Sequence, residues 1–173
     1  MYGHIPRKHQ DALRRFVRGA RVVDLGCGDM ERTWTLLGCD PEAVLAVDSH
    51  LPSSPKAHPR LTLHQGLFND SLGVIRDFRP TVAHVSWPAN YLTGLVKLLT
   101  DIPTVIYVGC NTDGTACGER ALFQYMLTRK MVRYLPDRQN TLIVVTKLLD
   151  NPRDATYEEK AALDQTEVYP YRA

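Results

Sequence analysis

The chain has 173 residues, of which 44% are hydrophobic and 23% charged, with a net charge of +2. This composition supports one buried core, and it excludes a disordered chain, a fibre and a membrane span, since no apolar run reaches about 18 residues. The small charge does not by itself indicate a nucleic-acid partner, and the first residues lack the apolar stretch of a signal peptide, so we expect one cytoplasmic domain over residues 1–173.

The expected elements follow one another as helical patterns that alternate with short apolar runs. Residues 1–20 contain a basic helix, about 9–19, in which Leu13, Phe16 and Val17 recur at helical spacing. Six runs rich in β-branched residues have the length of buried strands, namely residues 21–25, 43–47, 61–64, 81–85, 104–108 and 141–145. Helical patterns lie between them at residues 33–37, 71–78, 91–99 and 118–134.

Strands that alternate with helices indicate right-handed βαβ units. We therefore predict an α/β fold, a doubly wound and mostly parallel sheet over residues 21–147 with helices on both faces. Residues 148–173 begin with a turn and continue as a short helix and an edge strand over 166–171, where Pro170 excludes the sheet interior. Edge strands added to parallel sheets often run antiparallel, so we expect about seven strands with the last one antiparallel.

The most informative segment is the turn after the first predicted strand, where Asp24-x-Gly26-x-Gly28 leads into a helix. Two glycines allow a sharp turn and the close approach of a ligand, which in such sheets lies at the carboxyl ends of the strands. A P-loop is excluded because no Gly-Lys-Ser/Thr follows. Glu31 takes the place of the third glycine of a dinucleotide fingerprint, and Asp29 adds to its charge. The turn therefore favours a cationic ligand without phosphate.

The second predicted strand ends in Asp48, which lies 20 residues beyond Gly28. At this spacing a carboxylate reaches the hydroxyls of a ribose and accepts hydrogen bonds from both. Nicotinamide-dependent enzymes have an acid at the same place. Asp48 therefore indicates a nucleoside and leaves the cofactor open.

The Asp24–Gly28 pattern resembles motif I of the class I, Rossmann-like, S-adenosylmethionine-dependent methyltransferases, with Met30 in place of the last glycine. The resemblance implies a single methyltransferase-like domain with a Rossmann-like core over residues 21–147 and S-adenosylmethionine as cofactor. The residues that it places at the cofactor are Asp24, Gly26, Cys27, Gly28, Asp48, Ser49, Leu67 and Ser86.

The turn after the fourth predicted strand resembles motif IV of the amino-methylating members of this family. Ser86 and Pro88 fit the first and third places of that motif, whereas Trp87 and Ala89 do not fit the second and fourth. The resemblance implies that Ser86 orients the acceptor and that Trp87 or Tyr91 stacks on it, which makes these three the catalytic candidates. An aromatic lip over the cofactor is an equally supported interpretation. The acceptor itself, a small molecule or a nucleobase, is left unidentified.

Three functions remain open on the sequence. The first is a methyltransferase that acts by in-line transfer at the carboxyl ends of the strands. The second is a module that binds S-adenosylmethionine or S-adenosylhomocysteine without catalysis, which the incomplete motif IV favours. A nicotinamide-dependent oxidoreductase is disfavoured by Glu31 and by the absence of Tyr-x-x-x-Lys.

Residues 1–21 carry six basic side chains against one acid. A solvated helix face is the commoner meaning of such a cluster. The alternative is a patch that steers an anionic substrate, or a nucleic acid through a weak contact with Arg14, Arg15 and Arg18. Residues 109–118 form a glycine-rich rim of unassigned role, and nothing in the sequence indicates an oligomeric state.

The cysteines are the remaining candidates for special chemistry. The four are Cys27, Cys39, Cys110 and Cys117. No two of them are separated by a zinc-site spacing, so we expect reduced thiols and no metal.

Overall fold

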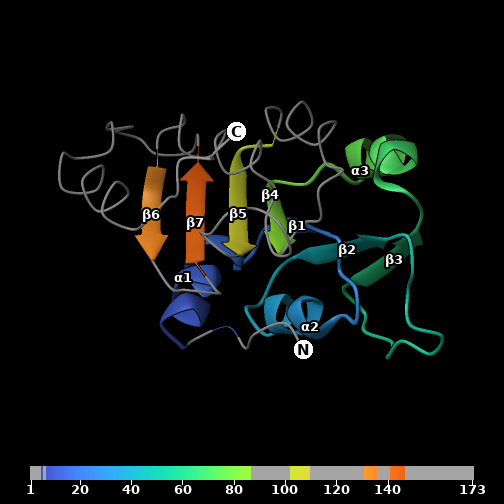
Figure 1. Cartoon of the computed structure of the whole chain (residues 1–173), viewed down its shortest axis with the longest axis horizontal. Coiled ribbons are helices and arrows are strands. Elements are labelled where there is room, and N and C mark those ends of the chain that lie inside the picture. The colour runs from blue at the N-terminus through green and yellow to red at the C-terminus, as the bar shows by residue number, and fades with distance from the viewer. Residues whose placement is uncertain (1–4, 6, 87–101, 110–130, 136–140, 147–173) are drawn as a thin grey trace, which may run out of the picture.

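The computed structural model describes residues 5, 7–86, 102–109, 131–135 and 141–146 (Figure 1). Within these residues the strands form one seven-stranded sheet. They are β1 (Arg21–Leu25), β2 (Ala43–Asp48), β3 (Leu61–Gln65), β4 (Val82–Ser86), β5 (Thr104–Gly109), β6 (Met131–Leu135) and β7 (Thr141–Thr146). The predicted α/β fold with a mostly parallel sheet is confirmed.

The strand order is β3-β2-β1-β4-β5-β7-β6. Strands β1 to β5 are parallel, and β7 lies antiparallel between β5 and β6. The chain moves outward from β1 to β3 and then returns to place β4 on the other side of β1. Strand order therefore reverses between β1 and β4, and in open α/β sheets ligands bind in the crevice at such a point.

One face of the sheet is covered by α1 (Arg7–Val17) and α2 (Glu31–Leu37). Side chains of both helices pack in one core cluster with alternate residues of the strands. This cluster includes Leu13, Val17, Leu36, Val22, Val44, Val82 and Ile106. The apolar spacing in α1 that predicted a helix is thus explained by burial against the sheet, and Gly19 ends the helical segment with a φ of 68°.

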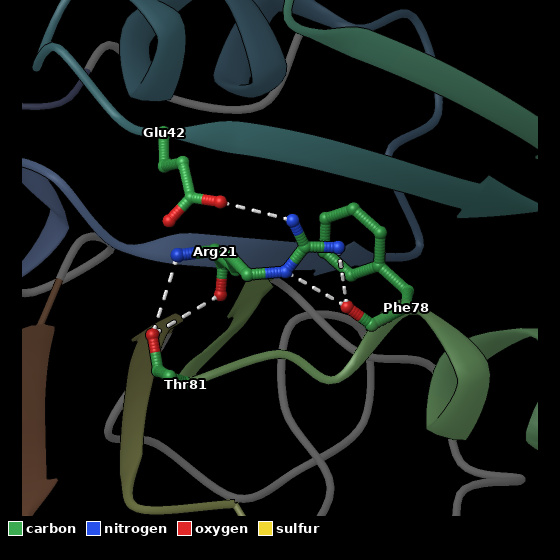
Figure 2. Close-up of polar contacts among 4 residues, drawn as sticks. All are labelled: Arg21, Glu42, Phe78 and Thr81. Atoms are coloured by element: carbon green, nitrogen blue, oxygen red, sulfur yellow. Dashed lines mark hydrogen bonds and ion pairs between the residues drawn. The ribbon is translucent and has the colours of Figure 1, made fainter.

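The opposite face is covered by α3 (Leu72–Phe78), which follows the short 3-10 helix η1 (Phe68–Ser71). The Arg21 side chain points to this face, because side chains alternate along β1 and the neighbouring Val22 packs in the cluster under α1 and α2. The Arg21 guanidinium donates to the Phe78 carbonyl from Nε at 3.0 Å and Nη2 at 2.7 Å, and lies 4.5 Å from the centre of the Phe78 ring (Figure 2). It also pairs with Glu42 at 3.0 Å (Figure 2). Helices therefore cover both faces, as predicted.

One strand was not predicted, and another runs in a direction that was not predicted for it. Met131–Leu135 forms β6, whereas the sequence predicted the end of a helix there. Thr141–Thr146 is the antiparallel strand, a role that was expected of residues 166–171, which lie outside the described residues. A short run such as Met-Val-Arg-Tyr-Leu suits a half-buried strand as well as a helix. Only five residues separate β6 from β7, and a connection this short favours an antiparallel hairpin.

The predicted helices at 91–99 and 157–163, and residues 118–130 of the third, also lie outside the described residues. Among the residues that are described, no helix combines the length and the hydrophobicity needed to cross a membrane.

Candidate functional site

The turn between β1 and α2 lies at the carboxyl edge of the sheet and requires its glycines. Gly26 has a φ of 75° and Gly28 a φ of 52°, values in the left-handed region that only glycine adopts without cost. A Cβ built on either residue would meet no atom within 4 Å. The turn is therefore open on the side to which these positions point, and a ligand could approach its main chain closely.

Met30 caps α2 in the place where the resembled motif has its last glycine. Its φ of 67° is left-handed, which costs a residue with a Cβ about 1–2 kcal/mol. The side chain is 1% exposed and packs with Cys27 and Ala46 in a small cluster beneath the turn. Burial of this side chain offsets the backbone cost, so the position tolerates methionine.

Cys27 faces away from the open side of the turn. Its thiol is buried, and burial together with the nearby carboxylates of Asp24, Asp48 and Asp29 raises its pKa. The thiol therefore stays protonated and unreactive near neutral pH. The same three acids make the turn electronegative, which favours a cationic ligand.

Asp48 is hydrogen-bonded to the glycine turn, to the turn after β2 and to the turn after β3. Its Oδ2 accepts a hydrogen bond from the Gly28 amide at 2.8 Å, and its Oδ1 accepts one from the His50 amide at 2.9 Å. The Asp48 carbonyl accepts a hydrogen bond from Gly66 at 2.9 Å. Ser49 lies beside it, with its hydroxyl 2.9 Å from His50 Nδ1. A carboxylate has about four acceptor positions, so these two amides leave Asp48 able to accept the hydroxyls of a ribose.

Asp24 lies beneath the turn, in the layer between the sheet and α2. It is fully buried, and its Oδ2 accepts a hydrogen bond from the Thr33 hydroxyl at 2.6 Å. His84, its register partner on β4, is also fully buried and places Nδ1 2.8 Å from Asp24 Oδ1. Asp24 therefore connects β1, α2 and β4, and its predicted contact with the cofactor stays a prediction.

The pairing of His84 with Asp24 is what the sequence-based assignment missed. The position of His84 near the end of a predicted strand was a signal, but its partner is 60 residues away in the sequence. Because a carboxylate accepts, Nδ1 carries the proton. The imidazole Nε2 has no hydrogen-bond partner in the part of the chain that the structure describes.

Two other turns complete the described part of the edge. Leu67 follows β3 and is 64% exposed, so its apolar side chain is accessible at this edge. Gly66 precedes it, and a Cβ there would lie 2.9 Å from Ser71 Oγ and 3.1 Å from His64 Nε2, so a larger residue would disturb the turn. Ser86 ends β4 and is 8% exposed.

Six predicted cofactor residues are thus brought to one edge, namely Gly26, Gly28, Asp48, Ser49, Leu67 and Ser86, with Cys27 and Asp24 packed below. Trp87 and Tyr91 lie outside the described residues, as does the rim from 110 to 118. No cluster of three or more potential metal ligands occurs among the residues described.

Comparison with solved structures identifies the fold. A protein from Lactococcus lactis provisionally named a hemolysin has a TM-score of 0.64 at 13% identity, over 91% of this chain and 92% of that one. TrmK of M. capricolum, in complex with its natural cofactor product S-adenosylhomocysteine, has a TM-score of 0.52 at 12% identity, over 90% and 74% of the two chains. A Streptococcus pneumoniae protein provisionally named a tRNA (m1A22) methyltransferase has a TM-score of 0.55 at 11% identity, over 96% of this chain and 81% of that one.

No family model matches the chain, and no curated protein matches its sequence. At identities this low, the likeness to solved structures establishes the fold alone. Methyltransferases are among the similar structures, so the chain has a Rossmann-like methyltransferase fold.

Proposed function

We propose that the protein is an S-adenosylmethionine-dependent methyltransferase that acts on a planar or amine-bearing acceptor at the carboxyl edge of its sheet. The observation that carries this proposal is the open glycine turn faced by Asp48. Gly26 and Gly28 leave room against the main chain, and the Asp48 carboxylate lies beside that room on the next strand. The turn also lies where the strand order reverses, which is the usual ligand site of this fold, and the fold therefore supports the same function.

The described residues fit this cofactor. Asp48 would accept the ribose hydroxyls on acceptor positions that its two backbone donors leave free. The exposed side chain of Leu67 would pack on the purine, since it offers apolar area at the next turn of the edge. The carboxylates of Asp24, Asp29 and Asp48 favour the positive sulfonium and ammonium groups. When bound, S-adenosylmethionine supplies a methyl carbon activated by the sulfonium.

We place the acceptor at the end of β4, beside the glycine turn. Ser86 ends this strand next to the glycine turn, where its hydroxyl would orient an acceptor lone pair. Trp87 and Tyr91 follow in the sequence and would stack on a planar acceptor. Positioning of this kind accounts for most of the rate in methyl transfer, because the leaving group needs no protonation. A nucleobase acceptor agrees with the provisional name of the similar Streptococcus pneumoniae protein, a tRNA (m1A22) methyltransferase.

A binding module without catalysis is the second candidate. The observation that favours it is the incomplete motif IV, in which Trp87 and Ala89 replace the expected residues. A nicotinamide-dependent enzyme is disfavoured by the acids at the glycine turn, since a pyrophosphate would meet Asp29 and Glu31.

Calorimetric titration of the protein with S-adenosylmethionine, S-adenosylhomocysteine and NAD tests the cofactor. We expect the first two to bind and NAD not to bind. NAD binding without the other two would refute the proposal.

Methyl-labelled S-adenosylmethionine, incubated with the protein and with nucleic-acid, protein and metabolite fractions, then tests catalysis. Label in one fraction that disappears in the Asp48→Ala variant supports the transferase. Cofactor binding with no transfer to any fraction supports the binding module instead.

A further inference from the structure

We propose that the exposed face of α1 is a docking surface for the phosphate backbone of a nucleic acid, which presents a base to the carboxyl edge. This inference rests on the proposed function and deepens it, because it names the class of acceptor. The arginine face, as we call it, consists of Arg7, Arg14, Arg15 and Arg18, all of which are exposed.

The arginine face differs from the rest of the chain in net charge, and from the other side of α1 in exposure. Residues 1–21 hold six basic side chains and one acid, Asp11, whereas the whole chain has a net charge of only +2, so the remainder is net acidic. The opposite side of α1 is apolar and buried, through Ala12, Leu13 and Val17. At 100° per residue, Arg7, Arg14 and Arg18 fall within about 40° of one another around the helix axis. The helix therefore presents three of these cations as one stripe, with Arg15 about 60–100° to one side of it.

Among the described residues, Arg14 and Arg15 lack the carboxylate partners that Arg21 and Arg60 have. Arg21 pairs with Glu42 at 3.0 Å and also donates to a carbonyl, which makes it part of the fold (Figure 2). Arg18 only reaches Asp40 at 4.0 Å, with both side chains largely exposed. Arg14 and Arg15 form no ion pair within the described residues. A guanidinium without a carboxylate partner remains available for phosphate, to which it binds in a bidentate manner.

The end of the arginine face lies apart from the glycine turn. Only three residues separate α1 from β1, and the Gly19 amide donates to the Asp40 carbonyl just before β2, so the end of α1 lies at the amino edge of the sheet. The 11 residues of α1 span about 16 Å, similar to the length of a strand. The glycine turn lies at the opposite, carboxyl edge, so a nucleic acid bound at the end of α1 would have to extend across the sheet to reach it.

The acids of the site require such a separate surface. Asp29 and Glu31 are exposed on the glycine turn, and Asp48 lies beside it. Carboxylates that favour a sulfonium repel phosphates at the same place. A nucleic acid would therefore reach this edge through a base, while its backbone is held elsewhere by cations, as phosphate contacts commonly position a nucleic acid.

The test is binding of a fluorescently labelled, unmodified tRNA transcript, followed by anisotropy at salt concentrations between about 50 and 200 mM. The variant is Arg14→Gln combined with Arg15→Gln, which keeps good helix formers. The matched control is Arg76→Gln combined with Arg79→Gln, which removes the same charge from exposed positions on and after α3, on the other face of the sheet. A DNA duplex of similar length distinguishes RNA from any phosphate backbone.

We expect the Arg14/Arg15 variant to lower the slope of log Kd against log salt by about 1.5–2, and to weaken binding at low salt by about tenfold or more. The control should change the affinity about twofold or less. Equal losses in both double variants, or no loss in the first, would overturn the proposal. Thermal melting of both variants excludes unfolding as the cause.

Calorimetry with S-adenosylhomocysteine separates this inference from the proposed function. Unchanged affinity for S-adenosylhomocysteine in the Arg14/Arg15 variant, together with weaker tRNA binding, supports the docking surface. A protein that binds S-adenosylhomocysteine but not the tRNA or the DNA refutes the docking surface and leaves the cofactor proposal intact. A protein that binds the tRNA through these arginines but no cofactor refutes the proposed function instead.

Discussion

The buried pair of Asp24 and His84 allows a quantitative prediction for the variant His84→Leu. Leucine fills most of the imidazole volume but removes the donor that lies 2.8 Å from Asp24 Oδ1. The Asp24 carboxylate is fully buried, so water cannot replace that donor, and only the Thr33 hydroxyl at 2.6 Å remains. A hydrogen bond to a charged group contributes about 1.5–3 kcal/mol, and breaking a buried pair costs about 3–5 kcal/mol.

We therefore expect His84→Leu to lower the free energy of unfolding by about 2–4 kcal/mol. For a chain of this size that corresponds to a fall in Tm of roughly 4–16 °C. Urea unfolding followed by circular dichroism measures the change. His64→Leu is the matched control, since His64 is a strand histidine on β3 without a carboxylate partner among the described residues, and its loss should stay under about 1 kcal/mol.

A double-mutant cycle with Asp24→Ala tests the reasoning. The two single variants each leave one buried polar group without its partner, whereas the double variant removes both groups. Its loss should therefore be smaller than the sum of the two single losses by about 1.5–3 kcal/mol. Additive losses, or a loss under about 0.5 kcal/mol for His84→Leu, would show that the hydrogen bond does not stabilise the fold.

Four further predictions concern the glycine turn and its surroundings. Asp48→Ala should weaken S-adenosylhomocysteine binding by about 1–3 kcal/mol in calorimetry, while Asp77→Ala, which removes an exposed acid of α3, should not change it. Gly26→Val should abolish binding in the same assay, because a β-branched residue is strained at a φ of 75° and would fill the open side of the turn; retained binding would place the cofactor elsewhere. Trp87→Ala should keep the affinity within about tenfold and remove turnover, and a loss of affinity instead would assign Trp87 to the cofactor wall. Because the folded chain raises the pKa of Cys27, only the unfolded thiol ionises above about pH 9, so the free energy of unfolding should fall as pH rises there, and less so in Cys27→Ala.

The sequence predicted best those elements whose formation depends on local pattern. The apolar runs at β1, β2, β4 and β5 were located to within about a residue, because strands buried on both faces carry continuous β-branched runs. The strand β6 was missed because an edge strand of five residues has no such run. The direction of β7 follows from its short connection to β6, and recognising that connection requires β6 to be recognised first.

The site divides in the same way. Gly26, Gly28 and Asp48 were predicted because turn geometry and strand length fix what these positions need and where they lie. The partner of Asp24 was not predicted. The alternation of side chains along β1 decides to which face of the sheet the Asp24 carboxylate points. The register of β1 with β4 decides which residue lies beside it there. Neither the pairing nor the register is contained in the residues around Asp24.

The insertion of β4 beside β1 also has a consequence for the order of folding. Gly28 follows β1 and Asp48 ends the neighbouring strand β2, so the hydrogen bond between them closes a short loop of 20 residues. Ser86 reaches the site only when β4 pairs with β1, a contact that His84 and Asp24 make across 60 residues. Closing the longer loop is entropically more costly, and it forms a slower step. During synthesis the first three strands emerge without β4, so β1 has an unpaired edge until β4 arrives. Ser86 thus joins the glycine turn and Asp48 last, by the same event that covers the free edge of β1 and protects it from pairing with another chain.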